Sequence, residues 1–154
     1  MGLYQYSVME QEPRWLADVA RLLTRVHEKN PRDYNTIIAL GNLYFDMSQI
    51  GEGAAEEENR NIVKAREFYQ KALELKPGDA STRTELGLTY LYENPPQNEK
   101  AIAEFQKALR ANSQDEKSLE NITRAFINAG KMKEAAEFLN KLKKVWRWAC
   151  INIR

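Results

Sequence analysis

Apolar residues recur along the chain at the three- and four-residue spacings of a helix face. One recurring set has the form Leu-Gly-x-x-Tyr, and it occurs as Leu40-Gly41…Tyr44, as Leu86-Gly87…Tyr90 and in a degenerate copy as Ile122-Thr123…Phe126. Because three to four residues make one turn, the members of each set share one face of a helix. The glycine in this set lets a second helix approach that face closely.

A second set has the form Ala-x3-aromatic-x2-Ala followed by a helix-breaking residue. Its copies are Ala65, Tyr69, Ala72 and Pro77, then Ala101, Phe105, Ala108 and Ser113, and more weakly Ala135, Leu139, Leu142 and Arg147. The two sets alternate along the chain, so small residues on one helix receive large residues of the next. The pattern therefore predicts three antiparallel helical hairpins.

A lone helix is predicted ahead of these hairpins. Val19, Leu23, Val26 and Pro31 repeat the second set upstream, within a segment that begins at residue 14 and ends near residue 29. This segment has no partner helix of its own in the pattern. The prediction is thus one half-hairpin followed by three hairpins, or about seven helices.

The alternation resembles the tetratricopeptide repeat family, whose unit of about 34 residues reads W-x2-L-G-x2-Y…A-x3-F…P. The resemblance implies an all-α, right-handed superhelical solenoid of antiparallel hairpins. It divides the chain into a flexible N-terminal segment, a half-repeat helix, three repeats and a tail that continues the capping helix: 1–12, 13–33, 34–79, 80–115, 116–149 and 150–154. The stretches NPRD and LGNLYFD are similar to small bacterial members, some of which assist cytochrome c or nitrite reductase assembly.

The spacing between repeats exceeds the standard unit twice. Gly41 and Gly87 are 46 residues apart and Gly87 and Thr123 are 36 apart, whereas the alanines of the second set stay 36 and 34 apart. The excess therefore lies in the turns inside two hairpins, at about 46–61 and at 94–97. We expect residues 46–61 to form a short loop and then to extend the second helix backwards by about two to three turns. This acidic extension either contacts a basic partner or is a solvated charged surface, and the solvated surface is the favoured interpretation.

The resemblance also implies which residues line the concave groove of the solenoid. The candidates occupy particular positions on the first helix of each repeat: Asn35, Ile38, Asn42, Phe45, Thr84, Leu88, Leu91, Tyr92, Lys117, Arg124 and Asn128, with Asp46, Ser81, Glu120 and Ile127 at the remaining groove positions. Asn42 and Asn128 offer donors and acceptors to a peptide backbone, and Phe45, Leu91 and Tyr92 offer apolar contact. The alternative is that these are ordinary solvated or packed helix residues.

The best-known site of the family is a carboxylate clamp for acidic C-termini. By resemblance it requires basic and amide side chains at positions that hold Ile38, Asn42, Glu85, Lys117 and Asn121 here. Only Asn42 and Lys117 match, and Glu85 would repel a terminal carboxylate. We therefore expect no clamp, and a groove ligand that is uncharged or mixed instead of strongly acidic.

The C-terminal segment keeps helical spacing, and no proline stops it, so helix should continue past Val145. Trp146 and Trp148 lie there, with basic residues on the other face at Lys141, Lys143, Lys144 and Arg147. The favoured interpretation is a cap over the apolar face of the last repeat. A basic amphipathic helix that lies on a membrane or docks into a partner is the alternative, with Trp146 and Trp148 as secondary contacts.

Composition removes several other classes of function. Lys and Arg total 23 against 22 Asp and Glu, so there is no global charge favouring nucleic acid. His27 and Cys150 are each the single residue of their type, and phosphate-loop, metalloprotease and hydrolase motifs are missing. We therefore expect no catalysis, cofactor or metal. No apolar run approaches the ~20 residues of a membrane span, and the first residues lack a signal-peptide pattern.

The resulting prediction is a non-catalytic protein-interaction module that binds a peptide segment or a helix in its groove, with the assembly of a larger complex as one use. Two alternatives stay open. One is a self-assembling structural protein that forms homo-oligomers, and the other is a membrane-peripheral scaffold using the basic, tryptophan-containing C-terminal helix. The location is open between cytoplasm and periplasm, the latter if an N-terminal anchor has been removed.

Overall fold

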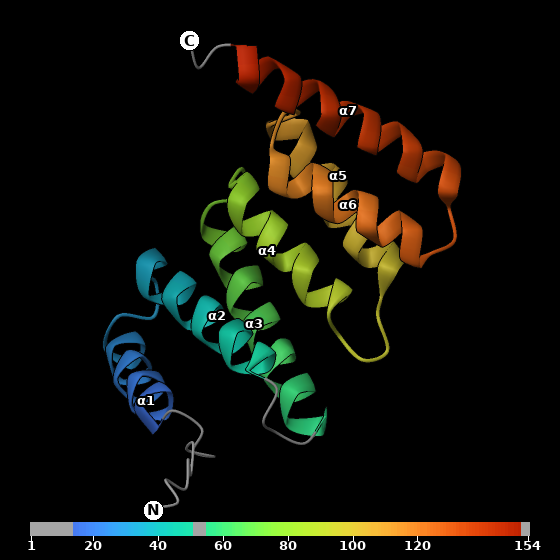
Figure 1. The fold of residues 1–154 in the computed structure, drawn as a ribbon. Coiled ribbons are helices and arrows are strands. Elements are labelled where there is room, and N and C mark those ends of the chain that lie inside the picture. The colour runs from blue at the N-terminus through green and yellow to red at the C-terminus, as the bar shows by residue number, and fades with distance from the viewer. Residues whose placement is uncertain (1–13, 51–54, 152–154) are drawn as a thin grey trace, which may run out of the picture.

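The computed structural model describes residues 14–50 and 55–151, and these ranges consist of helices and the turns between them (Figure 1). The helices are α1 (Arg14–Lys29), α2 (Tyr34–Gln49), α3 (Ala55–Leu75), α4 (Ala80–Leu91), α5 (Asn98–Ala111), α6 (Glu116–Asn128) and α7 (Met132–Ile151). The described ranges thus contain the seven helices that the sequence predicts. The expectations for residues 1–12 and for the last three residues fall outside the described ranges.

The helices stack as hairpins along one direction. α2 pairs with α3, α4 with α5 and α6 with α7, and the second helix of each hairpin packs against the first helix of the next. α1 packs on α2 at one end of the stack, and α7 lies at the other end (Figure 1). This arrangement is the predicted all-α solenoid of helical hairpins.

All three hairpins begin with the same kind of cap. An aspartate stands before the first helix, and its carboxylate accepts a hydrogen bond from a backbone N–H three residues later: Asp33 from Thr36 (2.8 Å), Asp79 from Thr82 (3.2 Å) and Asp115 from Ser118 (2.8 Å). This bond satisfies one of the backbone donors that the start of a helix leaves unpaired. The repeated cap starts α2, α4 and α6 in the same way.

Gly41 and Gly87 allow α2 and α4 to approach the helices that follow them. A Cβ atom at Gly41 would lie 2.7 Å from Cε1 of Tyr69, and a Cβ atom at Gly87 would lie 2.5 Å from Cε1 of Phe105. Both rings are fully buried, so close packing prevents them from moving aside. The predicted role of the glycine, as the residue that permits close helix approach, is confirmed in both complete repeats.

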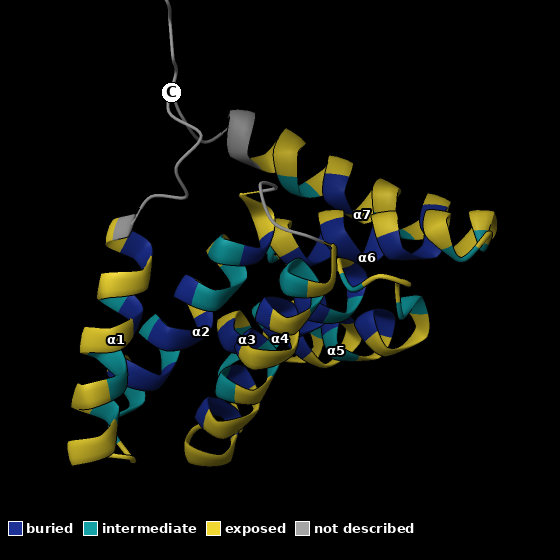
Figure 2. Ribbon diagram, turned by 90° about the horizontal axis from the view of Figure 1, so that it is seen from below, coloured by how far each residue is buried: buried dark blue, intermediate teal, exposed yellow. Residues whose placement is uncertain are grey.

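The core follows the stack from one end to the other. In Figure 2 the buried residues lie on the helix faces that are turned toward neighbouring helices, whereas the outer faces of α1 and α7 are largely exposed. The largest cluster joins α4, α5, α6 and α7 around Phe105 and Ile122. A second cluster around Tyr69 joins α3 to α4, and a third around Leu16 and Leu43 joins α1 to α2.

The extra residues of the first hairpin lengthen α3 at its N-terminal end. α3 begins ten residues before Ala65, at Ala55, whereas α5 begins only three residues before the equivalent Ala101. The difference of seven residues corresponds to about two turns of helix. This agrees with the expected backward extension, while residues 51–54 lie outside the described ranges.

α7 continues as a single helix through Ile151, as the lack of a proline predicts. Its core side carries Ala135 and Leu142, which are buried. Trp146 and Trp148 are 48% and 67% exposed, so neither ring is enclosed by the fold.

Candidate functional site

The predicted groove residues come from α2, α4 and α6, which follow one another along the stack (Figure 1). Six of them are exposed: Asn35, Asn42, Tyr92, Lys117, Arg124 and Asn128. Two are half-buried: Ile38 and Phe45. The remaining three, Thr84, Leu88 and Leu91, are buried.

The three buried residues all belong to α4, and their side chains hold that helix in place. Thr84 donates a hydrogen bond to the carbonyl of Ala80 at 3.0 Å, and its hydroxyl lies 2.6 Å from the hydroxyl of Ser118 on α6. Leu88 and Leu91 belong to the large core cluster. Leu91 is only 5% exposed, which corrects the expectation that its side chain is open to an apolar partner. The reason is that α4 is covered by neighbouring helices on both sides.

A first depression of about 280 Å³ is lined by residues of α2, α3, α4 and α6. It is lined by Asn42, Phe45, Asp46, Tyr69, Glu85, Leu88 and Lys117. Five of these occupy predicted groove positions, and they come from three different helices: Asn42, Phe45, Asp46, Leu88 and Lys117. The structure therefore brings part of the predicted set into one concave surface.

The floor of this first depression is organised by a hydrogen bond between Tyr69 and Asn42. The Tyr69 hydroxyl donates to Oδ1 of Asn42 at 2.9 Å. Burial raises the pKa of Tyr69, and the charges of Glu85 and Asp46 raise this pKa further, so the hydroxyl keeps its proton. With its oxygen bonded in this way, the exposed Asn42 has its NH₂ group available to donate to a ligand.

The two basic side chains of the predicted groove already have partners. Lys117 forms an ion pair with Glu85. Arg124 donates through Nη1 to the Tyr92 hydroxyl at 2.7 Å, and its Nη2 lies 3.4 Å from a carboxylate oxygen of Glu120. An acidic C-terminus would have to displace these partners before it could bind to either basic side chain.

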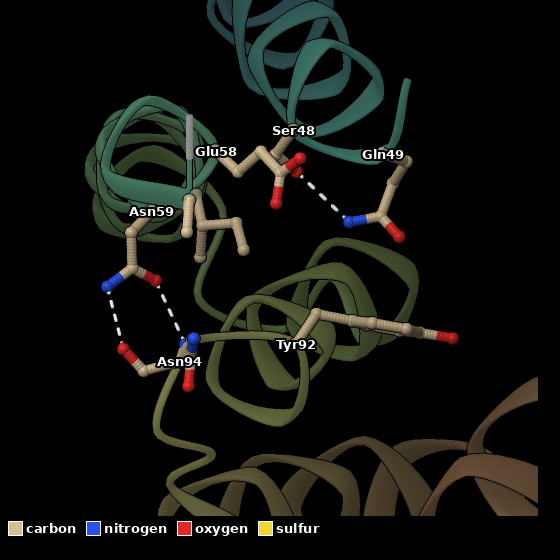
Figure 3. Close-up of a pocket in the computed structure, with 8 residues that line it drawn as sticks. Ser48, Gln49, Glu58, Asn59, Tyr92 and Asn94 are labelled. Atoms are coloured by element: carbon tan, nitrogen blue, oxygen red, sulfur yellow. Dashed lines mark hydrogen bonds between the residues drawn. The ribbon is translucent and has the colours of Figure 1, made fainter. Parts of the chain in front are cut away.

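A second depression of about 270 Å³ lies where α2 and α4 end and α3 begins (Figure 3). It is lined by Ser48, Gln49, Ala55, Glu58, Asn59, Ile62, Tyr92 and Asn94. The rings of Phe45 and Tyr92 meet edge to face, with centroids 6.0 Å apart. Because Phe45 lines the first depression and Tyr92 the second, this aromatic pair stands between the two.

Asn59 forms two hydrogen bonds that connect α3 to the turn after α4 on one side of the second depression. Its side chain donates to the carbonyl of Asn94 at 2.8 Å and accepts from the N–H of Asn94 at 2.9 Å (Figure 3). The extended start of α3 is thereby attached to the turn between α4 and α5. The sequence analysis did not predict this contact. The sequence does contain an indication of it, because the extra residues of the first two hairpins, at about 46–61 and at 94–97, both follow the first helix of their hairpin.

The exposed tryptophans belong to another part of the molecule. Trp146 and Trp148 lie on α7, where Asn140, Lys143, Lys144 and Arg147 line a separate depression of about 330 Å³. Neither tryptophan lines the depressions of the groove.

The described residues contain no group of three or more His, Cys, Asp or Glu side chains placed to hold a metal ion. His27 is half-buried at the end of α1 and packs edge-on against Phe68, with ring centroids 5.8 Å apart. Within residues 14–50 and 55–151, no helix has the length and apolar character that crossing a membrane requires.

No family model matches the sequence, and no curated protein matches it either. Solved structures do match. MamA AMB-1 is 21% identical with a TM-score of 0.69, and the match covers 85% of this chain and 69% of that one. A thermophilic TPR protein of Thermus thermophilus is 17% identical with a TM-score of 0.70, and the match covers 85% of this chain and 66% of that one. The chain has a tetratricopeptide repeat fold.

At these identities the likeness establishes the fold of this TPR chain and nothing about its ligand. MamA MSR-1 gives a similar result, with 20% identity and a TM-score of 0.66 over 88% of this chain and 70% of that one. The chain spans about two thirds of the length of these structures. None of these three structures supports the finer resemblance to proteins of cytochrome c or nitrite reductase assembly, which stays a prediction.

Proposed function

We propose that this protein is a non-catalytic interaction scaffold whose groove, along α2, α4 and α6, binds a peptide segment or a helix of a partner protein. The observation that carries the proposal is the pair of adjoining depressions on either side of Phe45 and Tyr92. An exposed aromatic surface beside free amide groups is typical of a contact site. Tyr92 is 40% exposed, and Ile127 on α6 adds a further exposed apolar side chain.

Side-chain hydrogen bonds between the helices of the groove support the same proposal, because they hold these helices in place before a partner binds. Tyr34 at the start of α2 donates a hydrogen bond to Asp79, and its hydroxyl lies 3.0 Å from that of Thr82 at the start of α4. Thr84 and Ser118 connect α4 to α6 in the same way. A preformed surface needs little reorganisation on binding, which leaves more of the contact free energy as affinity.

Site-directed photocrosslinking tests this function. A photoreactive p-benzoylphenylalanine is placed at Asn35 or Asn128 in the groove, and at the exposed Glu74 near the end of α3 as a control outside both depressions. We expect the two groove positions to form the same crosslinked product in cell extract, with Tyr92→Ala reducing its yield. Equal yields from position 74, or no product at either groove position, would contradict the proposal.

Self-assembly is a second candidate, favoured by the exposed apolar residues at the two ends of the stack. On α7, Met132, Leu139 and Trp146 recur every seven residues along one stripe and are exposed. On α1, Trp15 and Leu22 are exposed with the same spacing. Helix stripes of this kind pack against other helices. Light scattering over a range of concentrations distinguishes the candidates, because a strict monomer rules out self-assembly and leaves groove binding intact.

A further inference from the structure

The charge on the groove assigns a chemical class to its partner. Resting on the groove function above, we propose that the bound segment is basic, and that one of its arginine or lysine side chains enters the second depression between Glu58 and Tyr92. The partner is thus a protein segment with exposed cationic residues. This differs from the uncharged or mixed groove ligand that the sequence predicts, and it favours the basic-partner alternative for the acidic extension that contains Glu58.

Some charged side chains near the groove are already paired within the protein, and others are not. The cations Lys117 and Arg124 have partners within the protein, as described above. By contrast, Asp46 in the first depression and Glu58 in the second make no hydrogen bond or ion pair within the described part of the chain. Among the described residues that line the two depressions, the unpaired charges are therefore negative.

The second depression has the form that a cationic side chain requires. Glu58 and Gln49 lie on one side of it and Tyr92 lies across from them (Figure 3). A guanidinium group stacks on an aromatic ring and at the same time donates to a carboxylate. The volume of about 270 Å³ lies below the ~300–1,000 Å³ that is typical of pockets for whole small molecules, and it suits a single long side chain.

The first depression extends the same negative surface. Asp46 is exposed at the end of α2, and Asp46 and Glu85 both raise the pKa of the nearby Tyr69, after the larger effect of burial. A group whose pKa is raised by neighbouring carboxylates lies in a negative potential. A second basic residue of the partner would be favoured there, next to the NH₂ group of Asn42.

The overall charge of the protein does not provide this attraction. Lys and Arg exceed Asp and Glu by one, so the formal net charge is +1. A cationic peptide therefore experiences no general pull toward the molecule. Binding of such a peptide has to arise from the local arrangement of Asp46, Glu58 and Tyr92.

Fluorescence anisotropy with three labelled decapeptides tests the inference: (Arg-Ala)₅, (Gln-Ala)₅ and (Glu-Ala)₅. In an extended peptide, alternate residues face the same side, so these probes present one kind of side chain to the groove. We expect the arginine probe to bind most tightly and to weaken as salt is raised. Equal binding of the arginine and glutamine probes, or tighter binding of the glutamate probe, would overturn the proposal.

Single substitutions locate the binding. Glu58→Gln and Asp46→Asn should each weaken binding of the arginine probe about fivefold, which is the upper range for one partly exposed ion pair. Glu74→Gln removes the same charge outside both depressions and should leave the affinity unchanged. Identical affinities for all three variants would refute the site. If those affinities are identical but photocrosslinks still form in the groove, the groove function stands and only the charge assignment fails.

Discussion

Replacing Gly87 with alanine tests whether the glycine of the repeat sets the distance between the two helices of a hairpin. The new Cβ atom would lie 2.5 Å from Cε1, 2.8 Å from Cδ1 and 3.0 Å from Cζ of Phe105. Carbon atoms in contact are normally ~3.5 Å or more apart, so the overlap approaches 1 Å. Phe105 is fully buried in the largest core cluster, and relief requires that α4 and α5 move apart.

Two effects of opposite sign decide the outcome. In a helix interior, alanine is favoured over glycine by about 1 kcal/mol. Overpacking a close-packed core costs about 1–3 kcal/mol, and more where the neighbouring group is fixed. We expect the packing effect to dominate, with a net loss of about 1–2 kcal/mol in the free energy of unfolding, which corresponds to a melting temperature about 2–8 °C lower.

Urea unfolding followed by far-UV circular dichroism measures this loss. Gly78→Ala is the matched control, because a Cβ atom at Gly78 meets nothing within 4 Å. It should be neutral or slightly stabilising. Adding Phe105→Leu to Gly87→Ala should cost less than the sum of the two single substitutions, since the smaller side chain relieves the overlap. A Gly87→Ala variant as stable as the wild type would refute the reasoning, because helix propensity would then outweigh the contact.

Two further predictions concern the contacts between repeats. Asn59→Ala removes both hydrogen bonds to the backbone of Asn94, and we expect about 1 kcal/mol of destabilisation with faster hydrogen exchange at the Asn94 amide; unchanged exchange would show that the bonds are not formed. Burial raises the pKa of Asp79, but hydrogen bonds from Tyr34 and Thr82 outweigh it and hold this pKa below its usual value. The stability that this carboxylate provides is present above about pH 4 and is lost as the pH falls through its lowered pKa. The difference in melting temperature between wild type and Asp79→Asn should therefore shrink in acid, and a constant difference would contradict the assignment.

The fold was predictable because the residues that form the main contacts within a hairpin recur at regular spacings along the sequence. A glycine and a tyrosine share one helix face, an aromatic ring follows between two alanines, and the structure places that ring against that glycine in both complete repeats. Each of these contacts joins the two helices of one hairpin, so the alternation of the two sets along the chain identifies it. The caps at Asp33, Asp79 and Asp115 carry an equally regular signal just before each first helix.

The groove was less predictable, because the exposure of a position depends on what lies on either side of its helix. Leu91 and Ile127 occupy equivalent positions, yet Leu91 is buried and Ile127 is 48% exposed. α4 has neighbouring hairpins on both sides, whereas in the described ranges α6 has none beyond α7. A position-by-position projection from the repeat treats these two sites as alike, and only packing distinguishes them.

The extra residues of the first hairpin contact the longer turn of the second hairpin. The second depression forms at this contact, and most of its lining residues therefore come from the two places where the spacing differs from the standard repeat. Asn59 belongs to the extension of α3, and Asn94 belongs to the longer turn between α4 and α5. Two hydrogen bonds connect these two segments. Glu58, the neighbour of Asn59, lines the second depression only because α3 starts early enough to carry it there. If α3 were as short as α5, it would begin after Glu58 and Asn59, and neither side chain would line the second depression. The extra length of the first hairpin therefore provides the carboxylate of this depression.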